Sequence, residues 1–175
     1  GFNYPQTMCL GKGGVVYVAN RGNENNFGMR ANKVRIGAPG EEELLAEFFK
    51  WGTADGRSSW PFGVAIDSQE NVYLSDEWQN TISVFDSNGN FRRKWGNTGS
   101  GDGELLRPAG LVCEKNGNVI VVDSGNNRLQ VFTPEGKFLA KCGKGGTGDG
   151  EFNQPWGITL DNDGNIWVAD WKNHR

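Results

Sequence analysis

One pattern of residues recurs along this chain at intervals of 47. The tripeptide Pro-x-Gly occurs at residues 61–63, 108–110 and 155–157. A stretch that begins with Asn and ends with Asp occurs at residues 71–76, 118–123 and 165–170. A period of this length is typical of repeat architectures in which each unit is one supersecondary motif.

The unit at residues 107–142 predicts four short antiparallel strands. Its apolar runs are separated by turn signals at residues 116–118, 124–127 and 134–136, an alternation typical of a meander. Residues 119–122, Val-Ile-Val-Val, are apolar on both faces of the strand, so they must be covered on both sides. Since the neighbouring units supply that cover, the sequence predicts an all-β fold: a β-propeller of four-stranded antiparallel blades.

The repeat also resembles a known family. Residues 108–110 read Pro-x-Gly, residues 117–123 read Gly-Asn followed by an apolar stretch and Asp, residues 126–132 read Asn-Asn-Arg-Leu-Gln-Val-Phe, and residues 136–138 read Gly-x-Phe. This succession resembles the NHL repeat, strongly over residues 60–175 and weakly over residues 4–51. The resemblance implies a propeller, commonly six-bladed. It does not imply one chemistry, because propellers carry many functions.

The repeat predicts an incomplete arc, about 3.5 blades of six. We place the blades at residues 4–51, 60–95, 107–142 and 154–175, the first divergent and the last truncated. Residues 173–175 match residues 126–128, which open a third strand, so we expect a piece of a longer propeller. An open arc exposes apolar sheet faces, which predicts self-association.

Composition excludes some classes of protein. The net charge of −3 does not indicate a polyanion-binding surface, and no apolar run has the ~18 residues that a membrane helix needs. The three cysteines lack metal-site spacing, so buried free thiols are expected. The sequence begins at Gly1 rather than Met, which indicates a truncated N-terminus. It predicts a soluble protein and does not assign a compartment.

The first unit departs from the others. Relative to the second unit it carries eight extra residues within 21–31, which predicts an enlarged loop after its second strand. Residues 41–43, Glu-Glu-Glu, predict a solvated hairpin tip, with a short helix over residues 41–47 as the alternative.

One face of the propeller is the predicted ligand site. In a meander the loops after the second and fourth strands share one end of the sheet, and functional residues concentrate on such loops. The candidate binding residues on this face are Arg21, Phe27, Arg30, Asp76, Trp78, Asn80, Asp123, Asn127, Arg128, Asp170, Trp171 and His174.

Within this set, the residues that recur between units are expected to be structural, and the residues that do not recur are the candidates for binding. The Asp–Asn–Arg pattern recurs between units, which favours a structural role: Asp123 accepts hydrogen bonds from the amides of residues 125–127, and Arg128 pairs with Asp123 or with a neighbouring blade. The residues that break the repeat are the more informative candidates, namely Trp78, Trp171, His174 and the loop at 21–31. Exposed tryptophan is typical of a binding anchor.

The sequence therefore predicts a non-catalytic binding or sensor module for a protein, peptide or small ligand, with no cofactor. An alternative is a metal-dependent lyase, resembling the NHL-type peptidylamidoglycolate lyases, or a lactone-hydrolase-like propeller. Their resemblance makes His174, four residues after Asp170, a zinc-ligand candidate. A Zn²⁺ or Ca²⁺ cofactor is expected only under that alternative. The remaining metal ligands would then lie outside this chain, because catalytic zinc needs about three protein ligands.

The second alternative is RNA binding, which the resemblance to the NHL domains of tripartite-motif proteins implies. The candidate face carries eight acidic and five basic residues, so phosphate binding is disfavoured and nucleic acid is not the expected partner.

Overall fold

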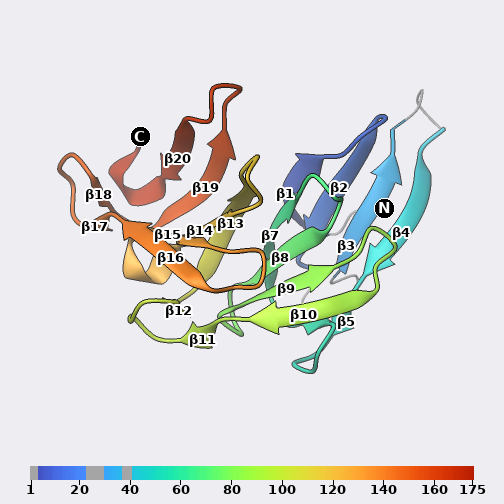
Figure 1. The fold of residues 1–175 in the computed structure, drawn as a ribbon, viewed down its shortest axis with the longest axis horizontal. Coiled ribbons are helices and arrows are strands. Elements are labelled where there is room, and N and C mark those ends of the chain that lie inside the picture. The colour runs from blue at the N-terminus through green and yellow to red at the C-terminus, as the bar shows by residue number, and fades with distance from the viewer. Residues whose placement is uncertain (1–3, 23–29, 37–40) are drawn as a thin grey trace.

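The computed structural model describes residues 4–22, 30–36 and 41–175. They form an arc of antiparallel sheets (Figure 1). The first sheet contains β1 (Pro5–Leu10), β2 (Val15–Asn20), β3 (Arg30–Arg35) and β4 (Glu43–Phe48). The second contains β7 (Pro61–Ile66), β8 (Val72–Asp76), β9 (Thr81–Phe85) and β10 (Phe91–Trp95). The third contains β13 (Pro108–Cys113), β14 (Val119–Asp123), β15 (Arg128–Phe132) and β16 (Phe138–Cys142), and a pair follows, β19 (Pro155–Leu160) with β20 (Ile166–Asp170).

Each sheet is a meander in which sequential strands pair, as the repeat predicts. The turns between strands are closed by side chains that bond their own backbone. Asp86 accepts hydrogen bonds from the amides of Asn88 (3.0 Å) and Asn90 (2.9 Å), and Gly89 takes the left-handed φ of +89° that its turn requires. Asp161 closes the turn between β19 and β20 in the same way.

The sheets pack face to face, which explains the doubly apolar strands. Val119 and Val121 of β14 pack with Tyr73 of the second sheet, whereas Ile120 and Val122 pack toward β19. All four residues are buried. The prediction that this strand is covered on both sides is therefore confirmed.

The first strand of each sheet lies innermost, and these strands approach one another closely: β7 packs against β1 and β13, and β13 against β19. A Cβ at Gly63 would lie 2.6 Å from the carbonyl oxygen of Ala109, and one at Gly110 would lie 2.7 Å from that of Trp156. The recurring Pro-x-Gly tripeptide is thus explained, because only glycine lets adjacent inner strands come this close.

One sequence-based expectation needs correction. The short helix considered over residues 41–47 is wrong, because residues 43–48 form β4 and pair with β3. The connections between sheets each carry a short parallel pair. These pairs are β5 (Lys50–Trp51) with β6 (Arg57–Ser58), β11 (Asn97–Thr98) with β12 (Glu104–Leu105), and β17 (Lys144–Gly145) with β18 (Glu151–Phe152).

Helix is confined to the single turns η1 (Ser124–Asn126) and η2 (Trp171–Asn173) in the part of the chain that the structure describes. No helix in these ranges is long and apolar enough to span a membrane.

Candidate functional site

The loops after the second strands meet the inter-sheet connections on one face. Asn80 donates to Thr98 Oγ1 (2.9 Å) and accepts from the amide of Arg107 (2.7 Å), and Asn127 accepts in the same way from the amide of Gln154 (2.7 Å). Asn80, Asn127 and His174 all have left-handed backbone, with φ of 57°, 54° and 55°. Asparagine is among the few residues that tolerate this conformation, which explains why it recurs at the position.

Asp123 and Arg128 form a closed structural network. The Asp123 side chain has no exposed surface and accepts from Leu106 N (2.7 Å), Arg128 Nε (2.7 Å) and the side chains of Asn126 and Gln130. The guanidinium of Arg128 also donates to three carbonyl oxygens in the connection at residues 100–104. The predicted pairing of Arg128 with Asp123 is confirmed.

The partners predicted for the Asp123 carboxylate are partly wrong. It accepts the amide of Leu106 rather than those of residues 125–127, because the connection before β13 lies closer than the turn after β14. Asp170 repeats this arrangement with the amide of Asn153 (2.7 Å). Asp76 differs, since it does accept the amides of the following turn, from Trp78 (2.9 Å) and Gln79 (2.8 Å).

A cleft of about 560 Å³ opens on the same face. It is lined by Arg21, Trp60, Glu77, Trp78, Asn80, Leu106, Arg107 and Trp156. Three of these residues, Arg21, Trp78 and Asn80, belong to the predicted set, and the Trp78 side chain is 75% exposed. The other five were missed.

Aromatic rings form the apolar part of this cleft and extend beyond it. Phe62, Ala109 and Trp156 occupy equivalent positions of the repeat. Because Ala109 is small, Phe62 and Trp156 reach across it and make an edge-to-face contact at 5.3 Å between centroids. Trp156 also packs on Trp171 at 4.9 Å, which joins that predicted residue to the edge of the cleft.

An Arg–Glu–Arg cluster forms the charged part of the cleft. Glu77 accepts from Arg21 through Oε2 and from Arg107 through Oε1, with Arg107 Nε at 3.0 Å. The guanidinium of Arg21 lies 4.9 Å from the ring centroid of Trp60, a cation–π geometry. Burial lowers the pKa of Arg21, and the neighbouring Glu77 carboxylate opposes that shift.

Among the predicted residues that do not line this cleft are Arg30 and His174. Arg30 lies in β3 and pairs with Glu47 beside a second, apolar hollow on the outer face of the first sheet. Phe27 falls outside the residues that the structure describes. His174 is exposed at the end of η2, where its amide donates to the carbonyl of Trp171.

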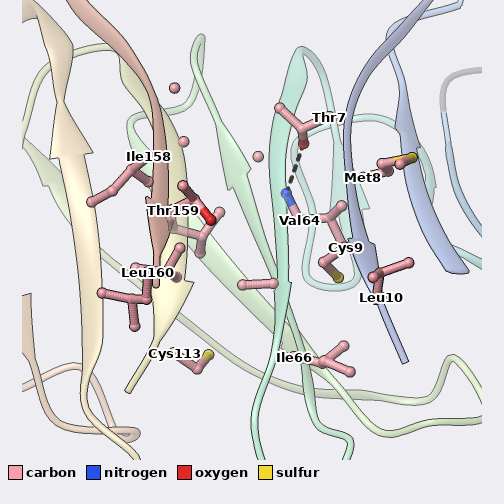
Figure 2. Close-up of a pocket in the computed structure, with 16 residues that line it drawn as sticks. Thr7, Met8, Cys9, Leu10, Val64, Ile66, Cys113, Ile158, Thr159 and Leu160 are labelled. Carbon is pink, nitrogen blue, oxygen red and sulfur yellow. Dashed lines mark hydrogen bonds between the residues drawn. The ribbon is translucent and has the colours of Figure 1, made fainter. Parts of the chain in front are cut away.

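The inner strands line a separate hollow of about 480 Å³ along the centre of the arc (Figure 2). Thr7 bridges β1 to β7 there, donating to Phe62 O (2.8 Å) and accepting from Val64 N (3.1 Å). Cys9 and Cys113 lie along the same hollow (Figure 2). Burial raises the pKa of Cys9 to about 12 and raises that of Cys113 as well, so both thiols stay protonated near neutral pH.

All three cysteines are free, as predicted, but the expectation that they are buried is too strong. Cys9 and Cys113 are half-buried, and Cys142 is exposed on the outermost strand β16. Among the described residues, no three His, Cys, Asp or Glu side chains are grouped so that they could hold a metal ion. The alternative that uses His174 therefore has no complete ligand set in the described part of this chain.

The fold and the geometry of this face define a β-propeller. The family model for the NHL repeat matches residues 105–132 and 152–175. These two stretches are accordingly NHL repeats, and the sheets of the chain are arranged as in a β-propeller. A search of curated protein sequences found no significant match.

Solved structures share the fold at low sequence identity. A catalytically inactive virginiamycin B lyase from Staphylococcus aureus with quinupristin aligns with a TM-score of 0.65 and 16% identity, over 96% of this chain and 49% of that one. A gluconolactonase from Xanthomonas campestris aligns with a TM-score of 0.64 and 14% identity, over 97% of this chain and 55% of that one. Hydrazine synthase from Kuenenia stuttgartiensis aligns with a TM-score of 0.65 and 14% identity, over 99% of this chain and 48% of that one. The chain spans about half the length of these structures, and the likeness establishes the fold alone.

Proposed function

We propose that this protein is a non-catalytic binding module that holds a peptide or small ligand in the aromatic cleft. The observation that carries the proposal is a contrast between equivalent positions of the repeat. Positions that build the scaffold keep their residue type, as Asp76, Asp123 and Asp170 do. Most positions that line the cleft do not, although Asn80 recurs as Asn127.

Two sets of equivalent positions show this contrast. The residue after the second strand is Arg21, Glu77, Ser124 or Trp171 in successive units, and the residue before the Pro-x-Gly tripeptide is Trp60, Arg107 or Gln154. The turns and the contacts between sheets are the same in every unit, so they require the same residue each time. A single ligand presents a different part of itself to each unit, so it requires different residues. Variation at the cleft therefore supports a site rather than scaffolding.

The composition of the cleft supports the same proposal. Exposed tryptophan and arginine are residue types that anchor ligands and partners. Tryptophan buries a large area with only two rotatable bonds, and arginine supplies a planar fork of hydrogen-bond donors. Three tryptophans and two arginines line this one cleft. A protein, peptide or small molecule fits such a lining better than a nucleic acid, because Glu77 neutralises part of its positive charge.

Indole N–H signals test the proposal. The full chain is titrated with the neutral aromatic probe 2-naphthamide, and the tryptophan side chains are followed by NMR. We expect the signals of Trp60, Trp78 and Trp156 to shift, and Trp78→Ala to weaken binding about tenfold, the order expected for one stacked aromatic anchor. Trp167, exposed on β20 away from the cleft, is the internal control. A uniform response, or none, contradicts the proposal.

A metal-dependent lyase or hydrolase is the second candidate. His174 supports it, because this side chain is exposed on the candidate face at the position where Asn80 and Asn127 stand in other units. This candidate requires a stoichiometric metal ion, Zn²⁺ or Ca²⁺, in the full-length protein. If the metal is Zn²⁺, which histidine nitrogen binds, it should be lost in His174→Ala. Elemental analysis that finds no metal in the full-length protein contradicts it.

A further inference from the structure

Every side-chain acceptor that lines the cleft already has a partner, whereas some of the side-chain donors have none in the part of the chain that the structure describes. Both carboxylate oxygens of Glu77 are engaged by arginine, and its side chain is only 14% exposed. The side-chain amide of Asn80 is engaged at both its oxygen and its nitrogen. The acceptors that line the cleft are thus already used within the protein.

The donors are not all used. Arg21 Nε is buried and has no hydrogen-bond partner within the described residues. A buried donor without an acceptor is unfavourable, so a ligand oxygen that reached this guanidinium would satisfy it. The Arg107 side chain is 52% exposed and shares Glu77 with Arg21. Arginine has only donors, and its planar fork matches a carboxylate.

The charges that face the cleft sum to one positive charge: two guanidinium groups and one carboxylate. Asp76 lies nearby and also acts on Arg21, but it is buried and occupied by Ser58, Ser59 and Gln79. Asp76 therefore lowers the positive electrostatic potential in the cleft, but it presents no oxygen to a ligand. No other titratable side chain lines the cleft among the described residues.

From these observations we infer that the ligand is a small aromatic monocarboxylate. Its flat body lies against Trp60, Trp78 and Trp156, and its carboxylate accepts from Arg107 and Arg21. This inference rests on the proposed function and adds the chemical class of the ligand. The carboxylate supplies the missing acceptor and neutralises the excess charge, while the rings bury the apolar body.

The test compares two probes of one shape. Calorimetry on the full chain measures the affinity of 2-naphthoate and of 2-naphthamide, which differ in charge and hardly in size. We expect the carboxylate to bind at least about tenfold more tightly, the order expected for one charge-assisted hydrogen bond. Arg107→Gln should weaken binding of 2-naphthoate more than binding of 2-naphthamide, and so remove most of this difference. Arg92→Gln, which breaks an exposed pair with Asp86 outside the cleft, is the matched control and should change neither affinity.

The possible failures are distinguishable. Equal affinity for the two probes overturns the anionic ligand and leaves the aromatic cleft in place. Failure of both probes to bind overturns the proposed function and this inference together. Arg107→Gln that weakens both probes equally also overturns the inference, because the arginine would then be shaping the cleft rather than binding the carboxylate.

Discussion

At the scale of single residues, Asp123 shows what the repeating positions do. Its carboxylate has no exposed surface and joins the start of β13, the turn η1 and strand β15 through four donors. Removing one partner of a buried ion pair leaves the other charge uncompensated, which is costlier than never having formed the pair.

We therefore predict that Asp123→Asn lowers the free energy of unfolding by about 3 kcal/mol, because Arg128 keeps its charge without a counterion. Urea denaturation measures the change. Asp102→Asn is the matched control, since Asp102 pairs with Lys141 at the surface and such pairs contribute about 0–1 kcal/mol. Similar losses for the two variants would mean that the buried network is not structural.

The cysteines test the burial of the inner strands. Burial raises the pKa of Cys9 to about 12, so almost none of this thiol is ionised at pH 8. The pKa of Cys113 is raised for the same reason, whereas Cys142 is exposed although partial burial also raises its pKa. Because the thiolate is the reactive form, we expect N-ethylmaleimide to label Cys142 first in the native protein. Mass spectrometry of the labelled peptides checks the order, and equal labelling before denaturation would show that the inner strands are open.

At the scale of elements, the Pro-x-Gly tripeptides set the distance between inner strands. A methyl group at Gly110 would meet the backbone of β19 at 2.7 Å, whereas at Gly157 the nearest atom is the Ala169 side chain at an ordinary 3.4 Å. We predict that Gly110→Ala destabilises the protein by about 2 kcal/mol through this clash. Gly157→Ala, the same substitution in the next unit, should cost less than about 1 kcal/mol. Thermal unfolding measures the loss of stability in each variant. Equal losses in the two variants would contradict the close approach of β13 and β19.

The elements also show what could be predicted from the sequence. The period of 47 residues, the turn residues and the doubly apolar strands predict stacked four-stranded sheets, and the structure confirms them. The parallel pairs β11–β12 and β17–β18 could not be predicted, because their strands are two residues long and lie in glycine-rich connections. Such segments are held by partners such as Arg128 rather than by an apolar pattern.

The candidate site was predictable in part. Trp78 and Trp171 break the repeat visibly, since they fall inside turns that elsewhere contain small polar residues. Glu77, Trp60 and Arg107 stand at positions of the repeat that no motif marks, and only alignment of the units with one another singles them out. These three residues come together because of the angle at which the sheets stack, and the spacing of residues in the sequence does not specify that angle.

At the scale of the whole molecule, the arc leaves apolar surface at both ends. Met8, Leu10 and Leu44 are exposed on the first sheet, as are Ile166 and Trp167 on β20. Patches of this kind drive association, because burying them removes apolar area from water. We predict that residues 1–175 self-associate, and that Leu10→Lys with Leu44→Lys reduces this association. Sedimentation velocity measures it, and a sharp monomer at high concentration would contradict the prediction.

The central claim is that the aromatic cleft, and not the hollow between the inner strands, holds the ligand. Crystallography of the full chain with 2-naphthoate tests it most directly. The account predicts the naphthyl ring against Trp60, Trp78 and Trp156, with the carboxylate on the guanidinium groups of Arg21 and Arg107. Ligand bound along Thr7 and Cys9 in the inner hollow, or a cleft left empty at saturating probe, would contradict it.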